Sequence, residues 1–423
     1  MNSTATIDNK KEPSALYRWT ILIFVSLAMF GNYYVYDSIS PLADLLSKQL
    51  NFTDADIGLL NGIYSLPNIF MVLIGGIIID KFGTRISSFL FALLCFIGAL
   101  LTAFSGGELL LMALGRLIFG LGAESLIVAV TTVLGRWFKG KQLSFAFGVN
   151  LTIARLGTFA ALNSPSWAKS LYTDWRLPLL VSVAAAVISL VSVIIYWGMD
   201  VYAERHYKVR PVPKQDKVNL KEIFNFPKSF WWIVALCVTF YSAIFPFQTF
   251  AVKFFIDVHG TTREFGGFLS SMLTLFAMIL TPLFGLLSDY IGKRSFLMMF
   301  GSLLLIPVYL LMNYTHVSLY VPMALMGISF SLIPAVMWPS VAIIIDESKL
   351  GTAYGLMTLI QNIGLAAFNF LIGAVNDATG GYSAGMWIFS MLGFFGLFFS
   401  YMLHKSETGP NGHGLEEGIK HAK

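Results

Sequence analysis

The chain has 423 residues, of which 56% are hydrophobic, 15% aromatic and only 12% charged, with a mean hydropathy of +0.72. Soluble domains carry about one quarter charged residues. These values therefore exclude a soluble enzyme, a disordered protein and a nucleic-acid-binding protein. The net charge of +5 is small, so the positions of the charges are more informative than their sum. The two cysteines, Cys95 and Cys237, lie in apolar runs and predict neither a disulfide framework nor a metal site.

Twelve apolar segments are long enough to cross a bilayer, whose hydrocarbon core of about 30 Å requires about 20 residues per helix. We expect them at roughly 19–41, 57–79, 86–105, 109–134, 142–166, 177–199, 229–252, 266–288, 295–313, 318–345, 352–375 and 383–404. The sequence thus predicts an all-α membrane protein built from two six-helix bundles. Its expected parts are a tail (1–18), a first bundle (19–199), a linker (200–228), a second bundle (229–404) and a tail (405–423).

The basic residues predict the orientation of the chain in the membrane. Five of the 28 lie in loops on one side, namely Lys48, Lys169, Arg176, Lys253 and Arg263, and two, Arg116 and Arg155, lie inside spans. The other 21 lie on the side of the two termini and the linker. Because cytoplasmic loops carry an excess of lysine and arginine, we expect both termini in the cytoplasm. We interpret the linker as a segment lying on anionic lipid.

The second half of the chain repeats the first at an offset of 209 residues. The repeated residues are Thr53, Gly58, Gly76, Asp80, Gly83 and Arg85, which recur as Thr262, Gly267, Gly285, Asp289, Gly292 and Arg294. This repeat predicts two bundles related by an axis along the membrane normal, with a binding site between them at the midplane.

The repeated loop also predicts a conformational latch. Gly76 and Gly285 would let neighbouring helices approach closely. Asp80 and Asp289 are placed to face a helix N-terminus and the arginine five residues later. The alternative is that these loops are only tight turns that carry positive-inside arginines.

Three motifs are similar to those of the major facilitator superfamily. They are GIIIDKFGTR at 76–85, GLLSDYIGKR at 285–294 and RLIFGLG at 116–122. The resemblance covers the whole chain, and it implies transport by alternating access.

Four ionisable residues lie within the predicted spans, where charges are costly and are candidates for function by default. At ~1.5 Å rise per residue, Glu124 and Arg155 lie at similar depths, roughly 18 and 21 Å from the cytoplasmic end. We expect them to present opposite charges to a zwitterionic substrate, or else to form a structural salt bridge with each other. Arg116 lies near the outer face, where it assists closure or reaches the lipid interface. For Asp37 we expect a role in gating. The alternative is that it caps a helix or faces water near the helix end.

The second half contributes aromatic residues and helix breakers. Phe245-Pro246-Phe247-Gln248 and Trp338-Pro339 interrupt two spans, and broken helices are tolerated where they line a cavity. The alternative is that these prolines only kink their helices. The residues that we expect to line the substrate cavity beside the two charges are Tyr36, Tyr64, Asn68, Phe245, Phe247, Gln248 and Trp338.

Longer stretches resemble the lysosomal dipeptide uniporters of this superfamily, which work with a glycosylated accessory subunit. These stretches are YSLPN (64–68), FGLGAESL (119–126), WFKGK (137–141), ARLG (154–157), the run 338–355 and QNIGLA (361–366). The resemblance implies facilitated movement of dipeptides without obligatory proton coupling. It also implies that Glu124, Arg155 and Trp338 belong to the pocket.

The chain departs from these uniporters in lacking an acidic dileucine sorting signal and in its short loops. We therefore expect a bacterial relative in the cytoplasmic membrane, acting as a monomer. The alternative is a lysosomal protein, for which an accessory membrane subunit would be expected.

The leading hypothesis is a dipeptide uniporter without a cofactor, in which Glu124 binds the amino terminus and Arg155 the carboxylate. The alternatives are a carrier of organic anions or monocarboxylates that uses Arg155 alone, and a proton-coupled peptide symporter. A phosphate-binding Gly-x4-Gly-Lys-Ser/Thr loop does not occur, which disfavours an ATP-driven pump. The spans hold no histidine cluster or serine–lysine pair, so we do not expect an enzyme. We expect residues 409–414 of the tail to be disordered.

Overall fold

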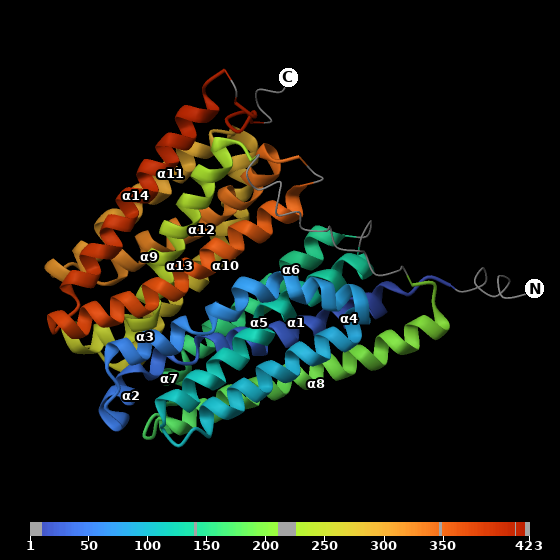
Figure 1. Cartoon of the computed structure of the whole chain (residues 1–423), viewed down its shortest axis with the longest axis horizontal. Helices are drawn as coiled ribbons and strands as arrows, with labels where there is room; N and C mark the ends of the chain where they lie inside the picture. Colours follow the sequence, from blue (N-terminus) through green and yellow to red (C-terminus); the bar gives the residue numbers. More distant parts are fainter. Residues whose placement is uncertain (1–10, 139–141, 210–225, 347–348, 411, 419–423) are drawn as a thin grey trace, which may run out of the picture. The chain divides into compact units, whose positions relative to one another are not determined.

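The computed structural model describes residues 11–138, 142–209, 226–346, 349–410 and 412–418. Residues 210–225, which hold most of the predicted linker, lie outside these ranges. The long helices are α1 (Ala15–Asp37), α4 (Ser65–Ala103), α5 (Leu109–Phe138), α6 (Leu143–Leu162), α8 (Arg176–His206), α9 (Lys228–His259), α10 (Arg263–Ile291), α11 (Arg294–Tyr314), α12 (Tyr320–Ile344), α13 (Leu350–Thr379) and α14 (Ser383–Glu407) (Figure 1). The short elements are α2 (Ala43–Leu50), α3 (Asp54–Gly62), α7 (Ser164–Trp167) and the 3-10 turns η1 (Ser40–Leu42) and η2 (Lys169–Leu171).

Eleven helical stretches of the described chain are long and apolar enough to cross a membrane, whereas the sequence predicts twelve segments. The difference arises in α4, a single helix that contains most of the two predicted segments 57–79 and 86–105. Within α4, Gly83 adopts φ 77° and ψ 169°, a left-handed backbone that favours glycine, and it separates two helical parts. The earlier predicted segment, 57–79, begins in α3 and is broken at 63–64 before α4 starts. All twelve predicted segments are therefore largely helical.

The helices group into two compact units by the contacts that each makes internally. Unit 1 comprises residues 1–37, 70–161 and 179–215, and unit 2 comprises 38–69, 162–178 and 216–423. Unit 2 thus contains the helices of the second half together with two segments of the first half.

Close helix contacts in unit 1 position the two predicted midplane charges. A Cβ on Gly122 of α5 would lie 2.3 Å from the carbonyl oxygen of Phe91, so α5 packs tightly on α4 two residues before Glu124. A Cβ on Gly157 of α6 would lie 2.2 Å from the carbonyl oxygen of Phe30, two residues after Arg155. Only glycine permits these approaches. They hold the backbone around both charged residues against neighbouring helices.

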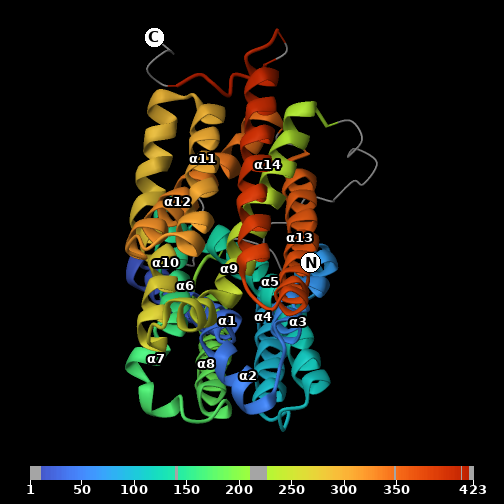
Figure 2. The same ribbon diagram turned by 90° about the vertical axis from the view of Figure 1, so that its left-hand side faces the viewer.

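Unit 2 is built from paired helices. α10 packs on α12, α11 on α12 and α14, and α9 on α13 and α14 (Figures 1 and 2). α3, from the first half of the sequence, packs along α13. Their contact is close, because a Cβ on Gly58 would lie 2.2 Å from the carbonyl oxygen of Asn369, and one on Gly373 would lie 2.2 Å from that of Asp54.

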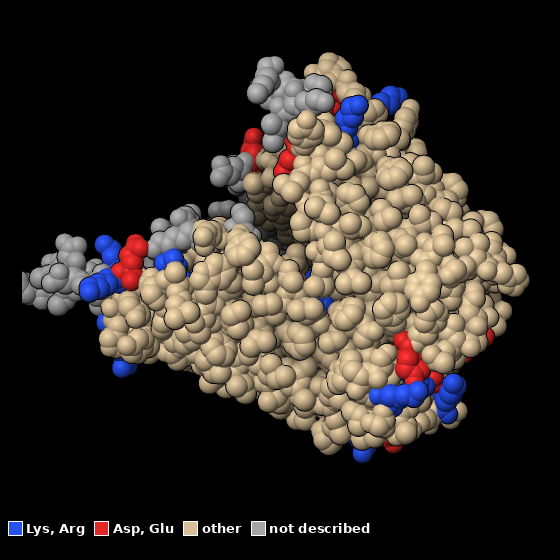
Figure 3. All heavy atoms as spheres, turned by 180° about the vertical axis from the view of Figure 1, so that it is seen from behind, with Lys and Arg blue, Asp and Glu red and all other residues tan. Residues whose placement is uncertain are grey.

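Large apolar side chains cover the outside of the helices. Ile77 is 67% exposed and Leu286 is 69% exposed. Charged side chains gather in a few places on the face shown in Figure 3, and most of that face is uncharged. Monomeric soluble proteins rarely expose apolar patches of this extent, whereas a bilayer solvates such a surface.

Candidate substrate site and gates

In unit 1 an acid and a base from adjacent helices both act on one tyrosine. The guanidinium carbon of Arg155 on α6 lies 5.8 Å from the centre of the Tyr33 ring on α1. The Tyr33 side chain also interacts electrostatically with Glu124 of α5 and with Asp37 at the end of α1. Charges from three helices therefore act on one tyrosine. Tyr33 was not among the predicted site residues, although its position one helical turn before Asp37 could have indicated it.

Glu124 and Arg155 do not neutralise each other. The half-buried Glu124 carboxylate forms no hydrogen bond or ion pair with Arg155 or with any other residue that the structure describes. The alternative of a structural salt bridge between them is therefore wrong for this structure. A desolvated carboxylate without a partner is costly, so this position favours binding of a cation.

The end of α1 is held by a buried arginine. Arg116 of α5 is 1% exposed and donates from Nη1 to the carbonyl oxygen of Val35 at 2.9 Å and from Nη2 to that of Tyr36 at 3.0 Å. These bonds satisfy carbonyls that the helix end leaves without partners. The alternative in which Arg116 reaches the lipid interface is therefore wrong, and its part in gating stays a prediction. Asp37 is only 8% exposed, so it does not face water.

In unit 2 Trp338 belongs to an aromatic cluster. Its indole Nε1 donates to the Tyr241 hydroxyl at 3.0 Å, and its carbonyl oxygen accepts from the Tyr354 hydroxyl at 3.0 Å. The Phe245 ring stacks on that of Tyr241, with centroids 5.6 Å apart and planes at 17°. We call Tyr241, Phe245, Trp338 and Tyr354 the aromatic cluster. Tyr241 and Tyr354 were missed because a tyrosine within an apolar run carries no sequence signal of its own.

The other predicted cavity residues of unit 2 are all buried, but their surroundings differ. Phe247 is 1% exposed and packs edge-on against Tyr309 and Phe389, so the structure places it in the hydrophobic core. Asn68 is fully buried, and its Nδ2 lies 3.4 Å from Asn362 Oδ1 of α13. Tyr64 and Gln248 are 4% and 6% exposed. Of these residues, Phe247 is the one whose surroundings disagree with a role in lining a cavity.

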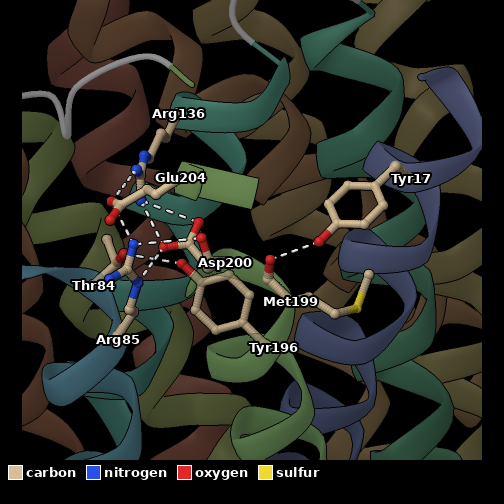
Figure 4. Close-up of polar contacts among 8 residues, drawn as sticks. All are labelled: Tyr17, Thr84, Arg85, Arg136, Tyr196, Met199, Asp200 and Glu204. Atoms are coloured by element: carbon tan, nitrogen blue, oxygen red, sulfur yellow. Dashed lines mark hydrogen bonds and ion pairs between the residues drawn. The ribbon is translucent and has the colours of Figure 1, made fainter. Parts of the chain in front are cut away.

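The first of the two repeated loops ends in a four-residue ion cluster rather than in the predicted aspartate–arginine pair. Arg85 Nε donates to Asp200 Oδ2 at 2.5 Å, and its Nη2 pairs with Glu204. Arg136 binds the same two acids at 2.9 Å each (Figure 4). The prediction that Arg85 contacts Asp80 is therefore wrong, because fully buried Asp200 on α8 binds it instead. α8 continues to His206, so Asp200 and Glu204 are helical although the sequence placed them in the linker.

The second repeated loop contains the predicted pair. Arg294 Nη2 donates to Asp289 Oδ1 at 2.7 Å, and we call this pair the latch. Gly285 differs from expectation. A Cβ on Gly285 would meet no described atom within 4 Å, so no close helix approach occurs there. In the first half Gly76 is buried, and a Cβ on the neighbouring Gly75 would lie 2.8 Å from Ser125 Oγ.

A second ion cluster joins segment 38–69 to the helices of the second half, within unit 2. Asp44 accepts from Arg263 Nε at 3.0 Å and from Nη2 at 2.6 Å, and Asp54 pairs with Lys253. The four side chains are between 2% and 20% exposed. We call Asp44, Asp54, Lys253 and Arg263 the end cluster.

Asp54 is also tied to α13. Asn376 Nδ2 donates to Asp54 Oδ2 at 3.0 Å. The Asp377 carboxylate accepts from the backbone N–H of Asp54 at 2.9 Å and of Ala55 at 2.7 Å, so it caps α3 from another helix. Sequence reasoning missed the end cluster. The few basic residues in the loops on the side opposite the termini could have indicated it. Four of them, Lys48, Lys169, Lys253 and Arg263, each bind an acid.

Metal-ligating side chains do not cluster in the described part of the chain: no three histidine, cysteine, aspartate or glutamate side chains there are arranged to hold a metal ion.

Long apolar helices, ionisable groups buried among them and a repeated loop define the class of helical membrane transporters. The model of the Major Facilitator Superfamily matches residues 25–266 and 247–422, and the chain belongs to this superfamily. It is a multi-pass membrane transporter, which implies a small-molecule substrate and a lipid environment.

Named relatives agree with this assignment, and a solved structure shares the fold. The chain is 32% identical over 379 residues to the lysosomal dipeptide transporter MFSD1 of Danio rerio, which covers 86% of this chain and 82% of the relative. It is 30% identical over 382 residues to the human protein of the same name, covering 87% and 82%. A crystal structure of the nucleoside transporter NupG superposes with a TM-score of 0.76 at 14% identity, covering 91% of this chain and 99% of that one. At that identity the structure shows the fold alone.

Proposed function

We propose that this protein carries dipeptides across a membrane by facilitated diffusion. Glu124 binds the amino terminus of the dipeptide, and Arg155 binds its carboxylate. The observation that carries the proposal is that Arg155 lies against the Tyr33 ring and Glu124 acts electrostatically on the same residue, and yet Glu124 has no ion partner among the described residues. The likeness to relatives named as dipeptide transporters supports it.

The chemistry of a dipeptide fits this arrangement. Its ammonium group supplies the cation that a desolvated carboxylate requires, and its carboxylate fits the planar fork of a guanidinium through charge-assisted hydrogen bonds. Neither contact depends on the side chains of the dipeptide, so side-chain preference has to come from other residues. We propose the aromatic cluster of unit 2 as a second ligand-contacting region, since aromatic surfaces accept varied apolar groups.

Uptake of labelled dipeptide into proteoliposomes tests the proposal. Glu124→Gln and Arg155→Ala should each reduce uptake by about tenfold or more, the effect of one lost charge-assisted contact. Glu108→Gln and Arg205→Ala remove the same charges at exposed positions and should transport as the wild type does. Wild-type uptake by both pocket variants would overturn the proposal.

Two variations of the same assay separate the alternative functions. If a pH gradient drives accumulation of the labelled dipeptide, the protein is a proton-coupled symporter and not a uniporter. Competition by free monocarboxylates, without competition by dipeptides, would favour a carrier of organic anions.

We further propose a bacterial cytoplasmic membrane as the location, a monomeric chain without an accessory subunit, and both termini in the cytoplasm. The excess of basic residues on the side of the termini supports this orientation. Because Cys95 and Cys237 are buried, a cysteine introduced at Ser14 can be labelled selectively. Labelling of intact cells by an impermeant maleimide at that position would contradict the orientation.

A further inference from the structure

The C-terminal tail is folded in its described part, contrary to the expectation of disorder for 409–414. The carboxylate of Glu407 accepts from the backbone N–H of His413 at 2.9 Å and lies 2.8 Å from its Nδ1. Leu415 is fully buried. Residues 412–418, which we call the strap, therefore pack on unit 2 after a turn that follows α14.

The strap binds the first turn of α11. Glu416 Oε1 accepts from the backbone N–H of Ser295 at 3.1 Å, and the carbonyl oxygen of Glu416 accepts from that of Lys293 at 3.1 Å. Backbone N–H groups at a helix start have no partner within the helix, and an anion there is favoured. His404 of α14 donates to or accepts from Ser295 Oγ at 2.8 Å and lies 3.9 Å from the Glu416 carboxylate. One acid thus ties α11 to the end of α14.

The strap also touches the latch. Arg294 binds Asp289 through Nη2, and its Nη1 donates to the carbonyl oxygen of Glu417 at 3.4 Å. The contact is close at the turn itself, because a Cβ on Gly292 would lie 2.4 Å from the carbonyl oxygen of Glu416. Gly292 has φ 64°, and this glycine therefore permits both the turn and the docking of the strap.

The two repeated loops differ in what holds their arginines. In unit 1 a Cβ on Gly83 would meet nothing within 4 Å, and Arg85 is bound by Asp200 and Glu204 of α8. At the repeat offset of 209 residues, Asp200 and Glu204 correspond to Gly409 and His413, which carry no acid. In unit 2 the strap supplies the missing acceptor.

We propose that the strap is a positioning element of the transport cycle. It fixes the first turn of α11 and so maintains the ion pair between Arg294 and Asp289. In unit 1 Asp200 and Glu204 of α8 hold Arg85 in a comparable way. Without the strap the latch forms less often, fewer carriers complete the cycle, and turnover falls while ligand affinity is unchanged. The turnover part of this inference rests on the proposed dipeptide transport; the docking part does not.

Two measurements on the membrane-embedded protein test the inference, one in nanodiscs and one in proteoliposomes. The first is amide hydrogen exchange over 293–297, and the second is the kcat and KM of dipeptide uptake. A chain ending at Thr408 and the variant Glu416→Ala should each exchange these amides about tenfold faster and lower kcat about tenfold, with the dipeptide Kd within about twofold of wild type. Glu416→Gln keeps an acceptor oxygen and should recover part of both effects. Glu417→Gln removes the same charge from an exposed side chain and should behave as the wild type.

The outcomes are distinct. Unchanged exchange over 293–297 in Glu416→Ala would overturn the docking, and faster exchange with wild-type kcat would overturn its role in transport. If the truncated chain does not fold, Glu416→Ala and Glu416→Gln decide the matter. A wild-type protein that transports no dipeptide would count against the proposed function, whereas the exchange measurement would still decide whether the strap holds α11.

Discussion

Asp54 and Lys253 form an ion pair although they lie 199 positions apart, and the pair binds the start of α3 to α9. Both side chains are largely buried, at 6% and 15% exposure. The same aspartate accepts from Asn376, so removing its charge affects two helices of the second half. The pair is therefore an anchor between the two halves of the sequence within unit 2.

Removing either partner of this pair should destabilise the protein. Asp54→Asn and Lys253→Ala should each lower the free energy of unfolding by roughly 2–3 kcal/mol, because a poorly hydrated charge loses its partner. Thermal unfolding in detergent measures the effect. Lys169→Ala breaks the pair with Glu264, in which the lysine is 76% exposed, and should cost less than about 1 kcal/mol. Equal losses for Lys169→Ala and Lys253→Ala would contradict the importance of burial here.

The ion cluster of unit 1 should depend on one of its acids far more than on the other. Asp200 is fully buried and binds both Arg85 and Arg136, whereas Glu204 is 48% exposed. Asp200→Asn leaves two arginines short of a counter-charge and should cost roughly 3 kcal/mol or more. Glu204→Gln should cost less than about 1 kcal/mol, since water replaces the lost charge. Denaturant unfolding distinguishes the two, and a larger loss for Glu204→Gln would refute the assignment.

Two glycine substitutions test the helix contacts. Gly58→Ala would place a Cβ 2.2 Å from the carbonyl oxygen of Asn369 and should destabilise the protein by about 2 kcal/mol or more. Gly285→Ala meets open space and should be neutral or stabilising by up to about 1 kcal/mol. Melting temperatures of the two variants provide the comparison. If Gly285→Ala destabilised the protein, that result would support the close helix packing that the sequence predicts at this position.

Tyr33 should contribute to ligand affinity through Arg155. Tyr33→Phe keeps the ring under the guanidinium and should retain most of the affinity. Tyr33→Ala removes it and should weaken dipeptide binding by roughly fivefold to thirtyfold, the range of a desolvated cation–π contact. Calorimetry with a single dipeptide gives both values. Identical losses for the two variants would mean that the hydroxyl, and not the ring, is the group that matters.

The fold was predictable because apolar length and loop charge dominate in a membrane protein. Glu124 and Arg155 stand out for the same reason, since an ionisable residue in an apolar run is conspicuous in any sequence. The aromatic neighbours of Trp338 are not conspicuous, because tyrosine and phenylalanine are common throughout these helices. Their selection depends on which rings the packing brings together, as Tyr241 and Tyr354 illustrate.

The ion clusters were missed for a different reason. Asp44, Asp54 and Asp200 lie near the ends of apolar segments, where an acid is usually hydrated, so nothing local marks them as buried. Their partners lie far away in sequence, at Arg263, Lys253 and Arg85. The tail shows the same limit. Its glycine-rich composition indicates disorder, but Glu416 finds free N–H groups at a helix start that only the folded chain provides.

The most direct test of the account pairs each charged residue with one end of the ligand. Affinities of a dipeptide, its N-acetyl form and its C-terminal amide are measured by calorimetry for the wild type, Glu124→Gln and Arg155→Ala. We expect acetylation to weaken binding to the wild type and hardly to affect Glu124→Gln. We expect amidation to weaken binding to the wild type and hardly to affect Arg155→Ala. Each modification removes an interaction that the variant has already lost. Equal sensitivity of all three proteins to both modifications would contradict the central claim that this acid and this base bind the two ends of a dipeptide.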